Sequence, residues 1–285
     1  MVPARFIVSQ IIPLPEETKS KLNIIEISTP LIIDDTEYRD NDLPFSTADF
    51  SDMLLSGKHK IETAANPPSE YAEIFKNTPP EVPIFVFCLS TKISAFYKSV
   101  TSAANGEAGR DVTVIDTLFC PPAPTLYAIA AAREAAESGD ASELKRRVRS
   151  LHSRIGVYWA LFSLEYLHQT GRISGAKAFI GKMLKLVPMI TTDPEGVIIP
   201  AGKTRRIGKS LDKISRYIER DLKEKQSESI DILVSYTGDE ENGLLLQDKV
   251  KERFNVGNAL FFKGGYCVHR YLGPNAAGLA YIAHS

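Results

Sequence analysis

Strand and helix patterns alternate through the first half of this 285-residue chain, and this alternation restricts its fold more than any other feature. Residues 84–89 form a continuous apolar run, which is typical of a strand buried on both faces. Helical patterns at 69–76 and 94–104 flank this run, and residues 112–115 predict a neighbouring strand. Strands separated by helices indicate a parallel sheet that helices cover on both faces.

The pattern changes near residue 155. Strand-like segments at 157–161, 187–190 and 197–199 follow with little helix between them, and a helical stripe of apolar residues runs from 207 to 222. Adjacent strands without intervening helices favour antiparallel pairs. We therefore predict an α/β chain with two domains, a parallel-sheet α/β domain over residues 1–155 and an α+β domain with a mixed or antiparallel sheet over 156–285.

Composition excludes several classes of protein. The chain has 34 Lys and Arg against 35 Asp and Glu, so it lacks the positive field of a nucleic-acid binder. It contains no apolar run of about 18 residues, and its first ten residues lack a secretory signal, so we expect a cytoplasmic protein. Its three widely spaced cysteines predict buried apolar side chains and no disulfide framework.

Known catalytic signatures are missing from the sequence. There is no G-x-S-x-G nucleophile elbow and no G-x-G-x-x-G loop after a strand. The five histidines do not have the spacing of metal ligands. The sequence therefore predicts neither a metal site nor a catalytic residue.

Two segments favour ligand binding. Ligands of parallel sheets bind beyond the carboxyl ends of the strands, and these ends carry residues 89–94 and 116–117. In the second segment a short helix ends at Gly171, Arg172 lies in the turn, and Ser174 can cap a helix that is rich in small residues. Small residues allow close approach either of a ligand or of another helix, and both interpretations stay open.

Four stretches together resemble a known family: the tyrosine-containing helix with Gly-Arg-Ile-Ser at 164–175, residues 184–190, the hairpin and Gly-Lys-Thr-Arg at 196–205, and the closing glycine-rich segment at 273–280. In order and spacing they are similar to the DegV family of bacterial fatty-acid-binding proteins, over nearly the whole chain. The resemblance implies a two-domain, non-catalytic carrier that needs no cofactor and buries one long-chain fatty acid between its domains.

The same resemblance implies a partner. Such carriers are the binding subunits of fatty acid kinase: a separate catalytic subunit phosphorylates the bound carboxyl group, and the acyl phosphate feeds phospholipid metabolism. For this chain we further expect a monomer that makes at most transient membrane contact.

The family's carboxyl-binding positions can be placed on this sequence. Arg172 matches the arginine of Gly-Arg-Ile-Ser, and Ser94 matches a loop serine. Tyr271 stands in place of the family's histidine, while His269, two residues away, would share its face if the segment is extended. The predicted carboxyl-binding residues are Thr63, Thr91, Ser94, Arg172, His269 and Tyr271.

This chain departs from the family pattern at Ala64, Ala65, Ala95 and Tyr271. Tyrosine can donate a hydrogen bond to a carboxylate but carries no positive charge at pH 7. Three alternatives to a fatty-acid carrier therefore remain. They are a different apolar carboxylate ligand, an enzyme of the hydrolase or transferase kind that uses Ser94 with His269, and a regulatory protein with a closed site.

Positive charge gathers in one stretch of the sequence. Residues 201–225 hold 9 basic and 4 acidic side chains, a net of +5. Lys203, Arg205, Arg206 and Lys209 begin this stretch and could face an acidic kinase partner or an acyl phosphate. A solvated hairpin and helix start is the competing interpretation.

Overall fold

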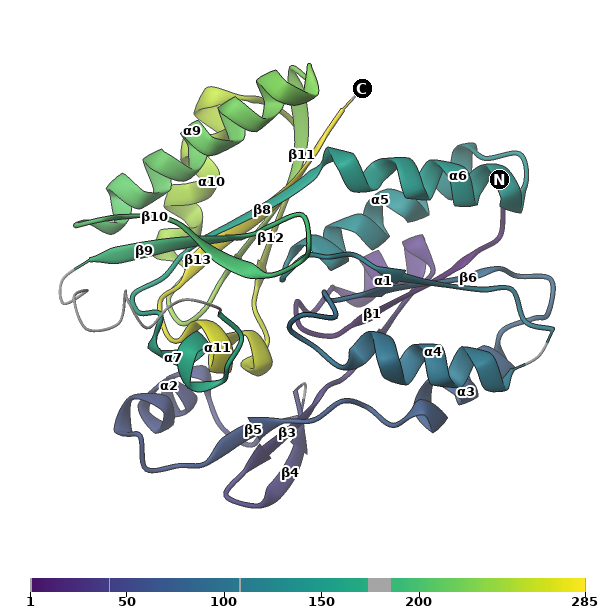
Figure 1. Cartoon of the computed structure of the whole chain (residues 1–285), viewed down its shortest axis with the longest axis horizontal. Coiled ribbons are helices and arrows are strands. Elements are labelled where there is room, and N and C mark those ends of the chain that lie inside the picture. Colours follow the sequence, from purple (N-terminus) through teal and green to yellow (C-terminus); the bar gives the residue numbers. More distant parts are fainter. Residues whose placement is uncertain (1, 41, 108, 174–185, 285) are drawn as a thin grey trace.

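A computed structural model describes residues 2–40, 42–107, 109–173 and 186–284 (Figure 1). The first half builds a four-stranded parallel sheet in the order β2-β1-β6-β7. Its strands are β1 (Arg5–Ser9), β2 (Ile24–Ile27), β6 (Ile84–Cys88) and β7 (Val112–Asp116), and its helices are α1 (Glu16–Leu22), α3 (Pro68–Asn77), α4 (Phe96–Gly106), α5 (Ala123–Glu137) and α6 (Ala141–Leu151). The predicted parallel sheet is confirmed.

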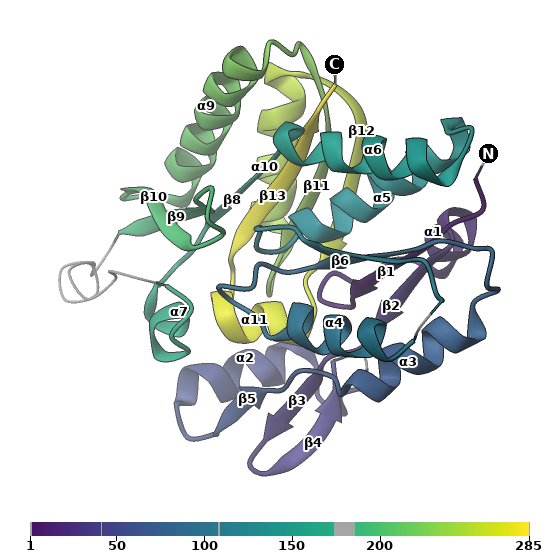
Figure 2. The same ribbon diagram turned by 45° about the vertical axis from the view of Figure 1, so that its right-hand side comes forward.

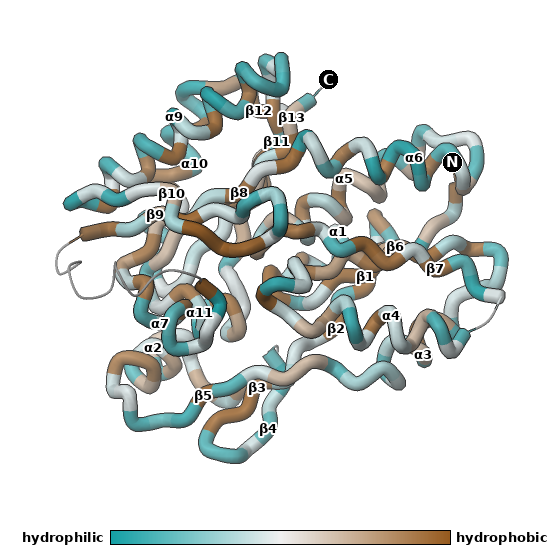
Figure 3. Tube along the Cα trace, viewed as in Figure 1, coloured by the Kyte–Doolittle hydropathy of each residue, from teal (hydrophilic) through white to brown (hydrophobic). Residues whose placement is uncertain are grey.

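Both faces of this sheet are covered. All five residues of β6 are buried, as its continuous apolar run predicts, and the same stretch is hydrophobic in Figure 3. Helices α3 and α4 lie on one face, and α5 packs on the other (Figures 1 and 2). Strand β7 was predicted to be buried, but it lies at the edge of the sheet and is only half-buried.

The second half builds a six-stranded mixed sheet in the order β10-β9-β8-β13-β11-β12. Only β11 and β12 pair in parallel, and the other neighbours are antiparallel. The strands are β8 (Ile155–Ala160), β9 (Val187–Thr192), β10 (Ile198–Thr204), β11 (Ser229–Tyr236), β12 (Asn255–Lys263) and β13 (Ala277–Ala283). Helices α9 (Ile207–Lys225) and α10 (Glu241–Arg253) cover one face, as the apolar stripe of α9 predicts.

Helix α5 lies between the two large sheets. It contacts β1, β2 and β6 of the first sheet and β8, β11 and β13 of the second (Figure 2). Ten of its fifteen residues are buried, because a helix sandwiched between two sheets needs an apolar surface on more than one side. All strands of the parallel sheet precede residue 155, and all strands of the mixed sheet lie at or after it. The division of the chain into two domains at this residue stays a prediction.

A third, small antiparallel sheet was not predicted. It consists of β3 (Pro30–Ile33), β4 (Thr36–Arg39) and β5 (Ile61–Thr63), and α2 (Thr47–Ser56) leads from β4 to β5. Ser46 and Asp49 form the capping box that begins α2. Helix α2 contacts α11 (Tyr266–Leu272), which also contacts α7 (Glu165–Gln169). The first half of the chain therefore reaches over to the last helix.

Candidate binding pocket

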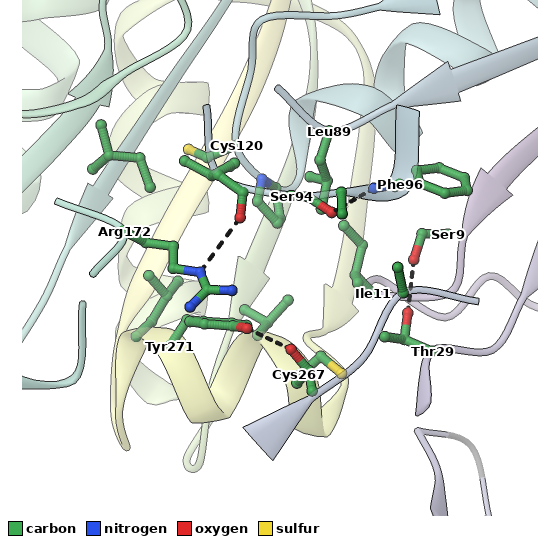
Figure 4. A pocket seen from close by; sticks show the side chains of 18 of the residues that line it. Ser9, Ile11, Thr29, Leu89, Ser94, Phe96, Cys120, Arg172, Cys267 and Tyr271 are labelled. Carbon is green, nitrogen blue, oxygen red and sulfur yellow. Dashed lines mark hydrogen bonds between the residues drawn. The ribbon is translucent and has the colours of Figure 1, made fainter. Parts of the chain in front are cut away.

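A cavity of about 200 Å³ opens where the two halves of the chain meet (Figure 4). From the parallel sheet, the last residue of β1 and the segments that follow β1 and β6 contribute Ser9, Ile11, Leu89 and Ile93. The order β2-β1-β6-β7 reverses direction between β1 and β6, and such a switch point is where ligands of parallel sheets bind. The predicted position of the site, beyond the carboxyl end of β6, agrees with this geometry.

The other walls come from the second half and from the small sheet. Trp159 lies on β8, Ile198 on β10, and Leu167 on α7. Helix α11 contributes Cys267, Val268, Tyr271 and Leu272, and the segment after β5 contributes residues 63–66. Most of these side chains are apolar, so the cavity is suited to a hydrocarbon chain.

Arg172 is the only charged side chain among the described residues that line the cavity. Its guanidinium carbon lies 5.1 Å from the ring centre of Tyr271, and its Nε donates to the carbonyl of Ile93 at 3.4 Å. Its Nη1 donates to the carbonyl of Thr170. Within the described residues no acceptor meets its Nη2 group, so this group can donate to a ligand.

Three hydroxyl groups accompany this guanidinium. The hydroxyls of Thr63 and Tyr271 lie 2.5 Å apart and share one hydrogen bond, which leaves one of their two protons for a ligand. Ser94 accepts from the amide of Phe96 at 3.2 Å, and its own proton has no acceptor among the described residues. We call Arg172, Tyr271, Thr63 and Ser94 the donor end of the cavity, because they combine unpaired N–H and O–H donors with the positive charge of the guanidinium.

Two of the predicted residues, Thr91 and Ser94, lie in the loop after β6. Ser94 lines the cavity, whereas Thr91 is not among the described residues that line it. Its exposed hydroxyl donates to Asp116 Oδ2 at 2.7 Å, and its amide donates to Oδ1 of the same carboxylate at 3.3 Å. These two bonds hold the loop after β6 against the end of β7. A carboxyl-binding role for Thr91 therefore gains no support from its position.

His269 is also outside the lining, because the segment around it is helical and not extended. Residues two positions apart on a helix point to different faces, so the side chain of His269 points away from that of Tyr271. Its Nε2 lies 3.1 Å from the hydroxyl of Ser51, its ring packs against Phe50, and its side chain is 1% exposed. The structure thus does not bring together Ser94 and His269, the pair that the enzyme alternative requires.

Burial lowers the pKa of His269 to about 4 from an ordinary value of 6.5, with a smaller contribution from Lys263. Below pH 6.5 the histidine is protonated in the unfolded chain but stays neutral in the folded chain. The free energy of unfolding therefore falls as the pH drops toward 4. We expect the wild type to lose about 2 kcal/mol relative to His269→Gln between pH 7.5 and 4.5. Urea unfolding at both pH values measures this, and parallel pH dependences would contradict it.

Helix α11 is anchored to the first half at almost every residue. The amide of Cys267 donates to Asp40 Oδ1 at 3.0 Å, the hydroxyl of Tyr266 donates to the carbonyl of Phe45 at 2.6 Å, and Arg270 Nε donates to the carbonyl of Ile61 at 2.7 Å. Burial raises the pKa of the Asp40 carboxyl to about 7. The wall that carries Tyr271 is therefore fixed by residues more than 200 positions earlier.

Sequence reasoning missed three polar groups of the cavity, namely Ser9, Thr29 and Asn66. Ser9 ends β1, so the rule that ligands bind beyond the carboxyl ends of parallel strands could have found it. Thr29 and Asn66 lie in connections around the small sheet, which was itself not predicted. Ser174 and Gly175, which follow Arg172 and Ile173 in the Gly-Arg-Ile-Ser signature, lie outside the described residues.

The family model described as "Uncharacterised protein, DegV family" matches residues 10–284. The chain belongs to the DegV family. A DegV domain-containing protein from Listeria innocua is 23% identical over 270 residues, which cover 94% of either chain.

Two solved structures share the whole fold. The first, a structure of fatty acid binding by a DegV family protein from Thermus thermophilus, has a TM-score of 0.89 at 22% identity, and the match covers 99% of this chain and 100% of that one. The second, a stearic acid-binding protein from Eubacterium ventriosum, has a TM-score of 0.87 at 21% identity and covers 98% of both chains. These likenesses establish the mixed α/β fold of DegV structures for this chain.

No helix within the described residues is both long and apolar enough to cross a bilayer.

The three cysteines are free and buried, as predicted.

Proposed function

We propose that this DegV protein is a carrier that buries one long-chain fatty acid in the cavity. The observation that carries the proposal is the cavity's division into an apolar wall and a donor end with a single positive charge. A carboxylate only accepts hydrogen bonds, so it complements a group of unpaired donors. Burial of about ten methylenes at about 0.8 kcal/mol each contributes about 8 kcal/mol, which corresponds to micromolar affinity before ordering costs.

The donor end would hold the carboxylate through Arg172, Ser94 and the Thr63–Tyr271 hydroxyl pair. Arg172 supplies the charge that tyrosine, in place of the family's histidine, cannot supply. The fatty-acid-binding structures that share this fold support a fatty acid as the ligand, and they favour it over a different apolar carboxylate.

Native mass spectrometry of the purified chain tests this function. We expect one fatty acid per chain, released by organic extraction and regained when stearate is added to the delipidated protein. Trp159, the sole tryptophan, lines the cavity, so its fluorescence should change during the same titration. A chain that carries no lipid and does not bind stearate or palmitate would contradict the proposal.

We further propose that the carrier presents the fatty acid's carboxyl group to a separate fatty acid kinase and is not itself the catalyst. Lys203 lies in β10, Arg205 and Arg206 follow this strand, and Lys209 lies in the first turn of α9. All four side chains are exposed, as a partner-facing surface requires. Exposed charges at the rim of such a contact mainly set the association rate.

Reversal of two of these charges tests the partner surface. We expect Arg205→Glu with Arg206→Glu to lower the rate of ATP-dependent fatty acid phosphorylation by roughly tenfold at low salt, with a smaller difference at high salt. Arg146→Glu with Arg149→Glu on α6 is the matched control, because these side chains are also exposed but belong to another element. Equal rates for the two double variants would contradict the proposed surface.

A further inference from the structure

The cavity has a second polar group of side chains, apart from the donor end. Ser9 and Thr29 lie on one side of the pocket in Figure 4, and Arg172 and Tyr271 lie on the other. Apolar side chains such as Ile11 and Leu89 also line the space. We call Ser9, Thr29 and Asn66 the mixed end, because these residues leave both a hydrogen-bond donor and a hydrogen-bond acceptor unpaired.

Asn66 offers an acceptor to the cavity. Its Nδ2 donates to the carbonyl of Ser28 at 2.8 Å and to Glu70 Oε2 at 2.8 Å. Both partners are acceptors, so they fix the amide with its nitrogen toward them and its Oδ1 on the other side. Asn66 is 4% exposed and lines the cavity, and within the described residues no donor meets its Oδ1.

Ser9 and Thr29 offer a donor. Their hydroxyl oxygens lie 2.9 Å apart and share one hydrogen bond, which leaves one hydroxyl proton without an acceptor among the described residues. Ser9 is buried, with 8% of its surface exposed. Thr29 follows Ser28, the residue whose carbonyl holds the Asn66 amide, so this donor and the acceptor of Asn66 lie on neighbouring parts of the wall.

A carboxylate does not fit the mixed end, because its oxygens would meet the lone pairs of Asn66 Oδ1 and none of the described residues brings a positive charge to this side. A methylene chain does not fit it either, because it would leave a buried donor and a buried acceptor unpaired, which is costly. A hydroxyl group fits, since it accepts one hydrogen bond and donates another.

We propose that the preferred ligand is a hydroxylated long-chain fatty acid, with its carboxylate at the donor end and its hydroxyl group at the mixed end. The inference rests on the proposed function and narrows its ligand class. Two additional hydrogen bonds in a buried site correspond to about a tenfold gain in affinity over the unsubstituted chain.

A competition experiment with the delipidated full chain tests this ligand class. Stearic acid is compared with a panel of monohydroxystearic acids that differ in the position of the hydroxyl group. We expect one or more of these isomers to bind about tenfold more tightly than stearic acid, because the hydroxyl must lie at one distance from the carboxylate. Weaker or equal binding of every isomer would overturn the inference, whereas failure of stearic acid and all isomers to bind would instead refute the proposed function.

Variants locate the effect. Ser9→Ala with Thr29→Val should remove the preference for the hydroxylated chain, because it removes the donor of the mixed end while the residues of the donor end stay in place. Thr91→Val, which removes a hydroxyl outside the described lining, should keep the preference. A preference that survives in the double variant would overturn the assignment to the mixed end, and circular dichroism of each variant verifies that it is folded. The wild-type panel decides the ligand class even if the double variant does not fold.

Discussion

Replacement of Arg172 by glutamine is expected to weaken stearate binding by about a hundredfold. Removal of one partner from a largely desolvated charge pair costs about 3 kcal/mol, because the remaining carboxylate loses its countercharge while it stays in an apolar cavity. Glutamine keeps hydrogen-bonding groups and much of the side chain's length, so the loss reports mainly on the charge. Isothermal titration of the delipidated protein with stearate at pH 8 measures it.

Two controls isolate the role of Arg172. Arg205→Gln removes an equal charge from the exposed segment after β10 and should leave stearate affinity unchanged. Methyl stearate carries no charge, so its affinity should change little in Arg172→Gln. If Arg172→Gln retains stearate as well as the wild type does, the carboxylate lies elsewhere and the donor end is assigned wrongly.

Replacement of Trp159 by alanine is expected to lower the free energy of unfolding by about 4 kcal/mol, the typical cost of truncating a large buried aromatic side chain. Trp159 has no exposed surface, and its indole N–H donates to the carbonyl of Pro121 at 2.6 Å. Its ring lies against Gly278, its neighbour on β13, so closely that a Cβ atom there would come within 2.2 Å of the indole.

Urea unfolding followed by circular dichroism measures this loss without relying on tryptophan fluorescence. Trp159→Phe is the matched variant: it keeps an aromatic ring on Gly278 and loses only the N–H donor and part of the volume, so we expect it to cost less than half as much. A loss below about 1 kcal/mol in Trp159→Ala would mean that neighbouring side chains move into the space that the indole leaves, and would contradict the expected cost of this truncation.

The large elements of this fold follow from local patterns. The run at 84–89 predicted the buried β6, and the stripe at 207–222 predicted α9, because burial of a strand or of a helix face leaves a periodic signal in the sequence. Strand β4 has no such signal, since its residues are exposed or half-buried at the edge of the small sheet. Strand β5 has three residues, too few to show a period.

The candidate site was predicted in part. The resemblance to the DegV family pointed to Arg172, Ser94, Thr63 and Tyr271, and the structure brings these four to one cavity. His269 was placed by assuming an extended segment, but Asp40 accepts from the amide of Cys267 in the first turn of α11, and a contact 227 residues apart cannot be read from local sequence. Ser9 pairs with Thr29 across 20 residues and Asn66 with Ser28 across 38, separations that are also beyond the reach of a local pattern.

The anchoring of α11 also orders events during synthesis of the chain. Tyr271 is made 208 residues after its hydrogen-bond partner Thr63. A nascent chain can assemble the parallel sheet first, but the proposed carboxyl-binding site is incomplete until α11 has been translated. For the proposed carrier, lipid loading then requires a chain that extends through α11, and a chain truncated before α11 would lack Tyr271 and bind stearate weakly.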